Sequence, residues 1–186
     1  MFGKRDDSLM GKRVLVISSS PRKDGNSDLI CHEFAAAARG AGNNVEEVAL
    51  RDLDVRPCRA CYACFRTGAC VQADDMTELL GKIDAADVLV VASPTYFLTM
   101  CGPLKVMIDR LLPKWQGLGG KDVYLAVTGH DGRAGLTRVV DDLRAVFENL
   151  GDAVRGVVWG ERVWQKGEVI GTAAMDEARA LGAGIR

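Results

Sequence analysis

The sequence contains only two histidines, no excess of charge of either sign and no long apolar run. Lysine and arginine number 24 against 25 aspartates and glutamates, so no basic field is available to hold nucleic acid or an anionic membrane surface. No apolar segment reaches membrane-spanning length. The first ten residues mix both charges and lack the apolar core of a secretory signal. We therefore expect a cytoplasmic protein whose partners are small molecules or proteins, with no nucleic acid and no membrane.

The length and composition indicate one folded unit. The chain has 186 residues, of which 48% are hydrophobic, and this suits a single domain with a substantial core. We expect a flexible N-terminal lead-in over residues 1–12, a single domain over 13–181 and a frayed tail over 182–186.

Short apolar runs alternate with helical patterns, which is typical of a parallel sheet covered by helices on both faces. Strands are predicted at 14–17, 45–50, 88–92, 123–127 and 154–159. The second run carries Glu46 and Glu47, so we expect it at an edge of the sheet, where charge discourages further pairing. The predicted fold is an α/β, flavodoxin-like, doubly wound five-stranded parallel sheet with the strand order 2-1-3-4-5.

In such sheets ligands bind at the carboxyl ends of the strands, near the loops after the first and third strands. The first of these loops is rich in hydroxyl groups and leads into a helix. It lacks both the nucleotide-triphosphate and the dinucleotide glycine patterns. Helix N-termini favour anions, so the loop suits the single phosphate of FMN; an ordinary polar turn is the alternative. Its candidate ligands are Ser18, Ser20, Arg22, Asn26 and Ser27.

The loop after the third strand suits a flat aromatic ring. Pro94 stiffens the turn, Thr95 offers a hydroxyl group, and Tyr96 and Phe97 supply aromatic walls. The alternative is that these aromatic residues belong to the core. In the helix that follows, Lys105, Asp109 and Arg110 are expected to form surface or interface ion pairs rather than to take part in chemistry.

The loop after the fourth strand should reach the same ligand. Thr128 and Gly129 are candidates for contacting the ring edge. His130 is a candidate hydrogen-bond donor, with a solvated loop residue as the alternative. Cys101 lies near the predicted ring site, but a buried thiol commonly acts as a small hydrophobic side chain.

Four cysteines lie within thirteen residues, at Cys58, Cys61, Cys64 and Cys70. The two-residue gaps allow three sulfurs to converge, and Gly68 gives the chain room to return the fourth, an arrangement that suits a 4Fe-4S cluster. Zinc is a weaker interpretation, because no second cysteine or histidine pair has the usual spacing. The spacing also fits a purely structural loop or a disulfide loop, although a reducing compartment disfavours the disulfide.

In combination, these segments resemble the iron-sulfur flavoproteins and their NADPH-dependent FMN reductase relatives. The resemblance covers roughly residues 13 to 160 and rests on the segments 20–27, 58–76, 93–96, 102–105 and 109–110. It implies an FMN-binding flavodoxin-like domain in a homodimer or homotetramer. It also implies that the four cysteines bind 4Fe-4S, that the first loop holds the FMN phosphate, and that residues 94–97 hold the ring.

The favoured hypothesis is an FMN-dependent electron-transfer oxidoreductase with a 4Fe-4S cluster. It would pass electrons between a reduced donor and a small-molecule or ferredoxin-like acceptor, with both cofactors at one edge of the sheet. The flavin would supply the chemistry, so no catalytic side chain is predicted. The alternative is an NAD(P)H-dependent FMN, quinone or azo-type reductase without a cluster. A third hypothesis is a metal-stapled interaction module without enzymatic activity.

Overall fold

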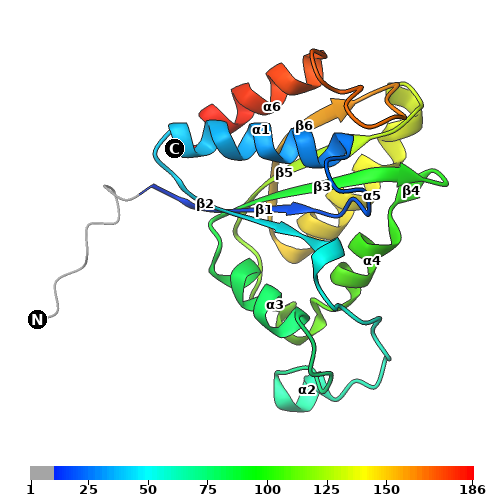
Figure 1. Ribbon diagram of the computed structural model, residues 1–186. Helices are drawn as coiled ribbons and strands as arrows, with labels where there is room; N and C mark the ends of the chain where they lie inside the picture. The colour runs from blue at the N-terminus through cyan, green and yellow to red at the C-terminus, as the bar shows by residue number, and fades with distance from the viewer. Residues whose placement is uncertain (1–10) are drawn as a thin grey trace, which may run out of the picture.

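A parallel sheet forms the centre of the structure, a computed structural model that describes residues 11–186 (Figure 1). Residues 1–10 of the predicted lead-in lie outside the described residues. The parallel strands are β1 (Arg13–Ser18), β2 (Asn44–Ala49), β3 (Val88–Tyr96), β5 (Asp122–Thr128) and β6 (Ala153–Gly160). Their order, β2-β1-β3-β5-β6, confirms the predicted order of five parallel strands and the edge position of the glutamate-bearing strand.

A sixth strand, β4 (Thr99–Met100), was not predicted. It pairs antiparallel with the end of β3, so the chain makes a short hairpin where the sequence indicated an open loop. Phe97 and Leu98 form the turn with positive φ values of 49° and 67°. This hairpin carries Tyr96, the last residue of β3, and Phe97 in its turn.

Helices cover both faces of the sheet (Figure 1). One face carries α1 (Asn26–Gly40) and α6 (Ala173–Ala183), and the other carries α3 (Met76–Ala85), α4 (Gly102–Asp109) and α5 (Arg133–Leu150). The short helix α2 (Cys64–Thr67) lies within the cysteine-rich loop, and the 3-10 turns are η2 (Leu50–Asp52) and η3 (Leu112–Lys114).

Alternation along the strands builds two separate cores. In β1, Val14 and Val16 pack with α1 and α6, whereas Leu15 and Ile17 pack with α3, α4 and α5. Successive strand residues point to opposite faces, and both faces are covered here, so the strand must be apolar throughout. Among residues 11–186, buried polar side chains consequently lie near the strand ends, in helices and in loops, while the glutamates of β2 lie on the edge strand.

The end of the chain, predicted as a frayed tail, packs against α1 instead. Helix α6 extends to Ala183, and Ile185 is only 3% exposed. Asn43 donates a hydrogen bond from Nδ2 to the Ile185 carbonyl over 3.2 Å. Gly182 allows the close approach of the two helices, because a Cβ atom there would lie 2.5 Å from the Phe34 carbonyl oxygen.

Within residues 11–186, every helix is too short or too polar to cross a membrane.

We predict opposite effects of alanine at two helical glycines. Gly182→Ala should lower the free energy of unfolding by about 1–3 kcal/mol, because its Cβ would meet the α1 backbone. Gly81→Ala in α3 is the matched control: its Cβ would meet nothing within 4 Å, so helix propensity should raise stability by about 0.5–1 kcal/mol. Urea unfolding of both variants measures the difference. Equal shifts would contradict the tight α1–α6 contact.

Candidate functional site

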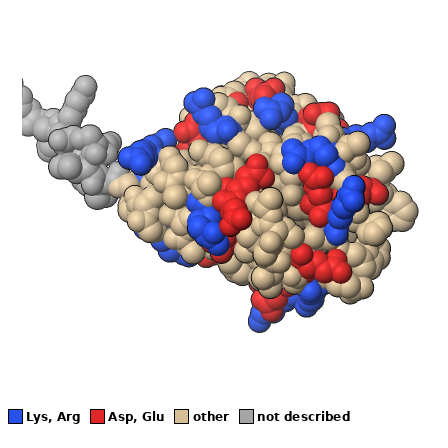
Figure 2. Space-filling model, turned by 90° about the horizontal axis from the view of Figure 1, so that it is seen from above, with Lys and Arg blue, Asp and Glu red and all other residues tan. Residues whose placement is uncertain are grey.

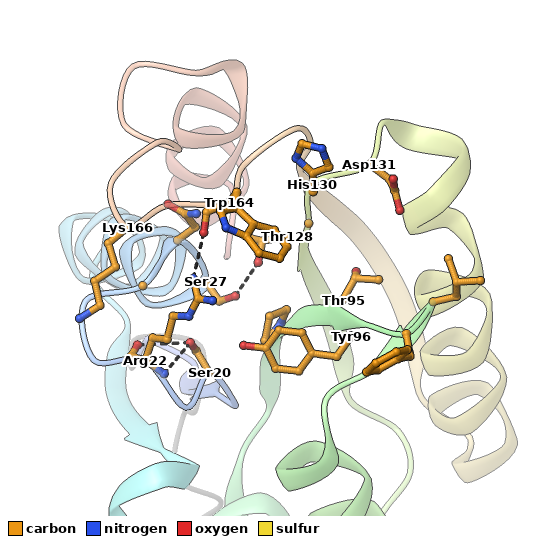
Figure 3. A pocket seen from close by; sticks show the side chains of 16 residues that line it. Ser20, Arg22, Ser27, Thr95, Tyr96, Thr128, His130, Asp131, Trp164 and Lys166 are labelled. Atoms are coloured by element: carbon orange, nitrogen blue, oxygen red, sulfur yellow. Dashed lines mark hydrogen bonds between the residues drawn. The ribbon is translucent and has the colours of Figure 1, made fainter.

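A cavity of about 350 Å³ lies at the carboxyl edge of the sheet (Figure 3). The loops after β1, β3 and β5 surround it, together with the segment after β6. Strands β2 and β3 flank β1 on its two sides, so this edge is the topological switch point at which doubly wound sheets bind ligands. Every predicted cofactor residue except Ser18 lines the cavity.

The loop after β1 forms a tight polar turn at the start of α1. Ser20 Oγ lies 3.2 Å from both the backbone nitrogen and the carbonyl oxygen of Arg22. The Gly25 amide donates to the Arg22 carbonyl over 3.1 Å, and a Cβ on Gly25 would lie only 3.0 Å from that oxygen. The first amides of a helix have no partner within the helix and favour an anion. This geometry fits a phosphate group.

Ser18 does not line the cavity, unlike the other predicted ligands. It stabilises the loop after β1 instead. Its hydroxyl group donates to the buried carboxylate of Asp28. Asp28 also accepts from the Asp24 amide over 2.9 Å and forms an ion pair with Arg51 over 2.7 Å. Arg51 in turn lies 3.4 Å from the Ser20 carbonyl oxygen. Asp28 and Arg51 therefore fix the loop conformation, and sequence reasoning missed both.

Two other predicted residues hold neighbouring segments together. Ser27 Oγ lies 2.8 Å from Thr128 Oγ1, which joins the start of α1 to the end of β5 (Figure 3). Asn26 donates from Nδ2 to the Gln165 carbonyl over 2.9 Å and accepts from the Val169 amide. The Asn26 side chain thus anchors the segment after β6, in addition to lining the cavity.

The opposite wall of the cavity is apolar and open. Tyr96 is 38% exposed, and Phe97 at the tip of the hairpin is fully exposed. Thr95, which lines the same cavity, has a buried Oγ1 atom without a hydrogen-bond partner among residues 11–186. An unpaired buried hydroxyl costs free energy, so this atom is available to a ligand. A polar atom beside an aromatic wall fits a flat heteroaromatic ring.

The segment after β6 closes the third side of the cavity. Sequence reasoning named only Trp164 in it, as a side chain that could shape an interface or shield the flavin, and favoured core or surface packing for it. Trp164 packs edge-on against His130, with ring centroids 5.9 Å apart. Arg22 donates to the Trp164 carbonyl over 2.9 Å. The amides of Trp164 and Gln165 donate to Glu168 and lower the pKa of its carboxyl group. The only sequence feature that could have predicted its role is its position, because the segment directly follows the last strand and so begins at the carboxyl edge of the sheet.

The four cysteines lie together on the loop between η2 and α3. All are free thiols, and they line one small cavity of about 20 Å³, roughly the space of one water molecule. In the described part of the chain, no three histidine, cysteine or acidic side chains are arranged to hold a single metal ion. A cubane cluster takes one thiolate at each iron corner, so its ligands need not converge on a point. The donor set therefore fits 4Fe-4S, and the exposed loop would have to widen around it.

The flavin-type cavity and the cysteine cavity are separate, although the cysteine loop follows the carboxyl end of β2. Their linings share no residue. Cys101 caps the start of α4 beside the hairpin, whereas Arg110 directly after α4 lines the cysteine cavity. The eight residues of α4 span about 12 Å. Cys101 itself is buried, with its sulfur 3.0 Å from Ser19 Oγ.

Charged side chains of both signs alternate over the face seen in Figure 2, without an extended field of one sign on that face. Elsewhere in the structure, charged side chains form surface pairs, such as Lys105 with Asp109 at 2.5 Å and Lys82 with Glu46 at 2.8 Å. The first of these confirms one predicted surface pair. Arg110, which was expected to pair on the surface as well, is instead buried.

Comparison with known proteins agrees with this geometry. Residues 12–163 match the family described as NADPH-dependent FMN reductase, and the chain belongs to this family. The structure is also similar to an azoreductase from Bacillus anthracis, with a TM-score of 0.75 and 20% identity, over 92% of this chain and 99% of that one. At this level of identity the similarity shows the fold.

Sequence relatives carry two kinds of description. An iron-sulfur flavoprotein of Methanocaldococcus jannaschii is 37% identical over 101 residues, which are 54% of this chain and 52% of the relative. An FMN-dependent NADH:quinone oxidoreductase of Azotobacter vinelandii is 33% identical over 112 residues, 54% of this chain and 56% of the relative. The chain spans about half the length of the curated relatives it matches most strongly.

We predict that Thr95→Val stabilises the flavin-free protein. Removal of the unpaired hydroxyl should raise the free energy of unfolding by about 1 kcal/mol, and loss of a donor to the ring should weaken binding of added FMN. Thr77→Val is the control, because Thr77 is exposed and outside the cavity. Chemical unfolding and flavin fluorescence titration provide the two values. Lower stability together with unchanged FMN affinity would contradict a ligand role for Thr95.

Proposed function

We propose that this protein is an FMN-dependent oxidoreductase that transfers electrons between a reduced donor and a small-molecule or protein acceptor. The observation that carries the proposal is the single cavity at the switch point, with a phosphate-binding turn on one side and an aromatic wall on the other. Membership of the NADPH-dependent FMN reductase family supports it.

In this proposal the chain binds and orients FMN and leaves part of the ring accessible. Arg22 and the amides at the start of α1 would hold the phosphate. Thr95 and the backbone at Thr128 and Gly129 would contact ring heteroatoms. Bound FMN supplies hydride and single-electron chemistry, so no side chain has to act as nucleophile or base. The open wall formed by Tyr96 and Phe97 leaves room for a nicotinamide or an acceptor to stack.

We further propose that Cys58, Cys61, Cys64 and Cys70 hold a 4Fe-4S cluster. Two observations support this: the four sulfurs line one cavity, and several matching relatives are described as iron-sulfur flavoproteins. Such a centre exchanges one electron at a time, which would allow a two-electron donor to serve a one-electron acceptor such as a ferredoxin-like protein. A homodimer or homotetramer is part of the same proposal.

The second candidate function is an NAD(P)H-dependent FMN, quinone or azo-type reductase without a cluster. The small volume enclosed by the cysteines favours it, as does the similarity to a quinone oxidoreductase. In this case the cysteine loop would have a structural role only. The two candidates share the flavin cavity and differ in the metal content of the loop.

Metal analysis of anaerobically purified protein separates the two candidates. We expect FMN together with iron and sulfide at the stoichiometry of one 4Fe-4S centre per chain. Cys70→Ser should lose the iron and keep the FMN, whereas Cys31→Ala, which alters a cysteine outside the loop, should keep both. If the parent protein binds FMN but takes up no iron after reconstitution with ferrous iron and sulfide, the cluster is disproved. Rapid bleaching of the flavin by NADPH would then support the second candidate.

The phosphate assignment makes a separate prediction. Arg22→Ala should weaken FMN binding by about 10- to 100-fold, because a charge-assisted hydrogen bond contributes roughly 1.5–3 kcal/mol. Lys23→Ala is the matched control: it removes the same charge from the adjacent exposed position, which does not line the cavity. Equilibrium titration with FMN compares the variants. Equal affinities of Arg22→Ala and the parent protein would refute the assignment.

A further inference from the structure

The cysteine loop is closed at its base by a polar neck, formed by residues 54–57 and 72–75. The Asp54 amide donates to Asp75 Oδ2 over 2.7 Å, and the Asp75 amide donates back to the Asp54 carbonyl over 3.1 Å. Gln72 donates from Nε2 to the Pro57 carbonyl over 3.1 Å. The two ends of the loop are therefore held side by side before the first and after the last cysteine.

Arg110 binds both sides of this neck from the end of α4. Its Nη1 atom donates to the Arg56 carbonyl over 2.6 Å and to Asp74 Oδ2 over 2.7 Å, and its Nη2 atom donates to Asp74 Oδ1 over 2.9 Å. The Arg110 side chain is 1% exposed and that of Asp74 is 0% exposed. These hydrogen bonds lower the pKa of Asp74 to about 2. Burial of two charges carries a desolvation penalty, so this pair requires well-aligned hydrogen bonds.

One nitrogen of the Arg110 guanidinium makes no hydrogen bond to Asp74 or to the neck. Arg110 Nε is buried and has no hydrogen-bond partner among the residues that the structure describes. Arg110 also lines the cavity shared by the four cysteines. The hydrogen bonds with Asp74 raise the pKa of the Arg110 guanidinium, against the effect of burial. A buried cation thus presents a free N–H group at the thiol cavity.

We propose that Arg110 is a positioning residue of the cysteine site. Its two terminal nitrogens close the neck of the loop, and its Nε–H donates a hydrogen bond to the anionic centre that Cys58, Cys61, Cys64 and Cys70 hold. The inference rests on the proposed 4Fe-4S cluster. Four thiolates give such a centre negative charge, and hydrogen bonds to its sulfurs stabilise the more negative, reduced state and raise the reduction potential.

Conservative replacement of Arg110 tests this role in the full chain reconstituted with ferrous iron and sulfide. Lysine keeps the charge but lacks the planar fork and the Nε donor. Arg110→Lys should release iron to a chelator at least 10-fold faster than the parent, and its midpoint potential should shift to a more negative value. Arg66→Lys in α2 is the matched control, because Arg66 is exposed on the same loop, and it should match the parent in both measurements.

Asp74→Asn separates closure of the neck from hydrogen bonding to the centre. This variant weakens the neck but keeps the Arg110 Nε–H group, so iron should be released faster while the potential does not fall. A fall in potential equal to that of Arg110→Lys would overturn a specific role for Nε. Arg110→Gln, which keeps an amide donor without charge, provides a second variant if the lysine variant does not fold.

Failure of this inference is distinguishable from failure of the proposed function. If the parent holds iron, and the lysine and glutamine variants release it at the parental rate and potential, the role of Arg110 is overturned while the cluster stands. If the parent itself takes up no iron, the cluster and the inference fall together. FMN content, measured in every variant, reports whether the fold and the separate flavin cavity are intact.

Discussion

Burial of both faces of the parallel sheet is the constraint on which the rest of the structure depends. The interior residues of the central strands β1, β3 and β5 pack against one helical layer or the other, so these interiors carry almost no polar chemistry. Functional groups are therefore found where the strands end, and the loops after β1, β3 and β5 meet there because parallel strands share one carboxyl edge. The position of the flavin-type cavity follows from the way the core is built.

Much of the cavity could be predicted from the sequence, because its residues directly follow strands that apolar runs reveal. Residues that act across long sequence separations could not be predicted in this way. Asp28 lies on α1, yet its partner Arg51 comes from η2, and no local pattern connects them. Trp164 reaches the cavity only because its segment folds back onto Asn26 and Arg22. Ser18 could not be distinguished from the cavity residues by its sequence position, because only the fold turns its hydroxyl group to Asp28.

Asp109 and Arg110, at the end of α4, also show that local sequence does not reveal contacts between distant segments. The sequence predicts both as surface charges. Asp109 does form a surface ion pair with Lys105, one helical turn away. Arg110 lies one position further around the helix, on the side that faces the cysteine loop, where Asp74 makes its burial possible. The sequence distance between Asp74 and Arg110 gives no sign of this pair. The grouping of the four cysteines, in contrast, could be predicted directly, because all four lie within thirteen residues of one loop.

The closed neck separates the cysteine loop from the sheet. Asp54 and Asp75 lie side by side, so the intervening loop begins and ends at nearly the same place and leaves the sheet undisturbed. Loop-closure entropy rises only slowly with length, and surface loops tolerate changes that cores do not. The cysteine cavity lies at the end of α4 and shares no lining residue with the flavin-type cavity. Changes in the cysteine loop can therefore leave the lining of the flavin-type cavity intact.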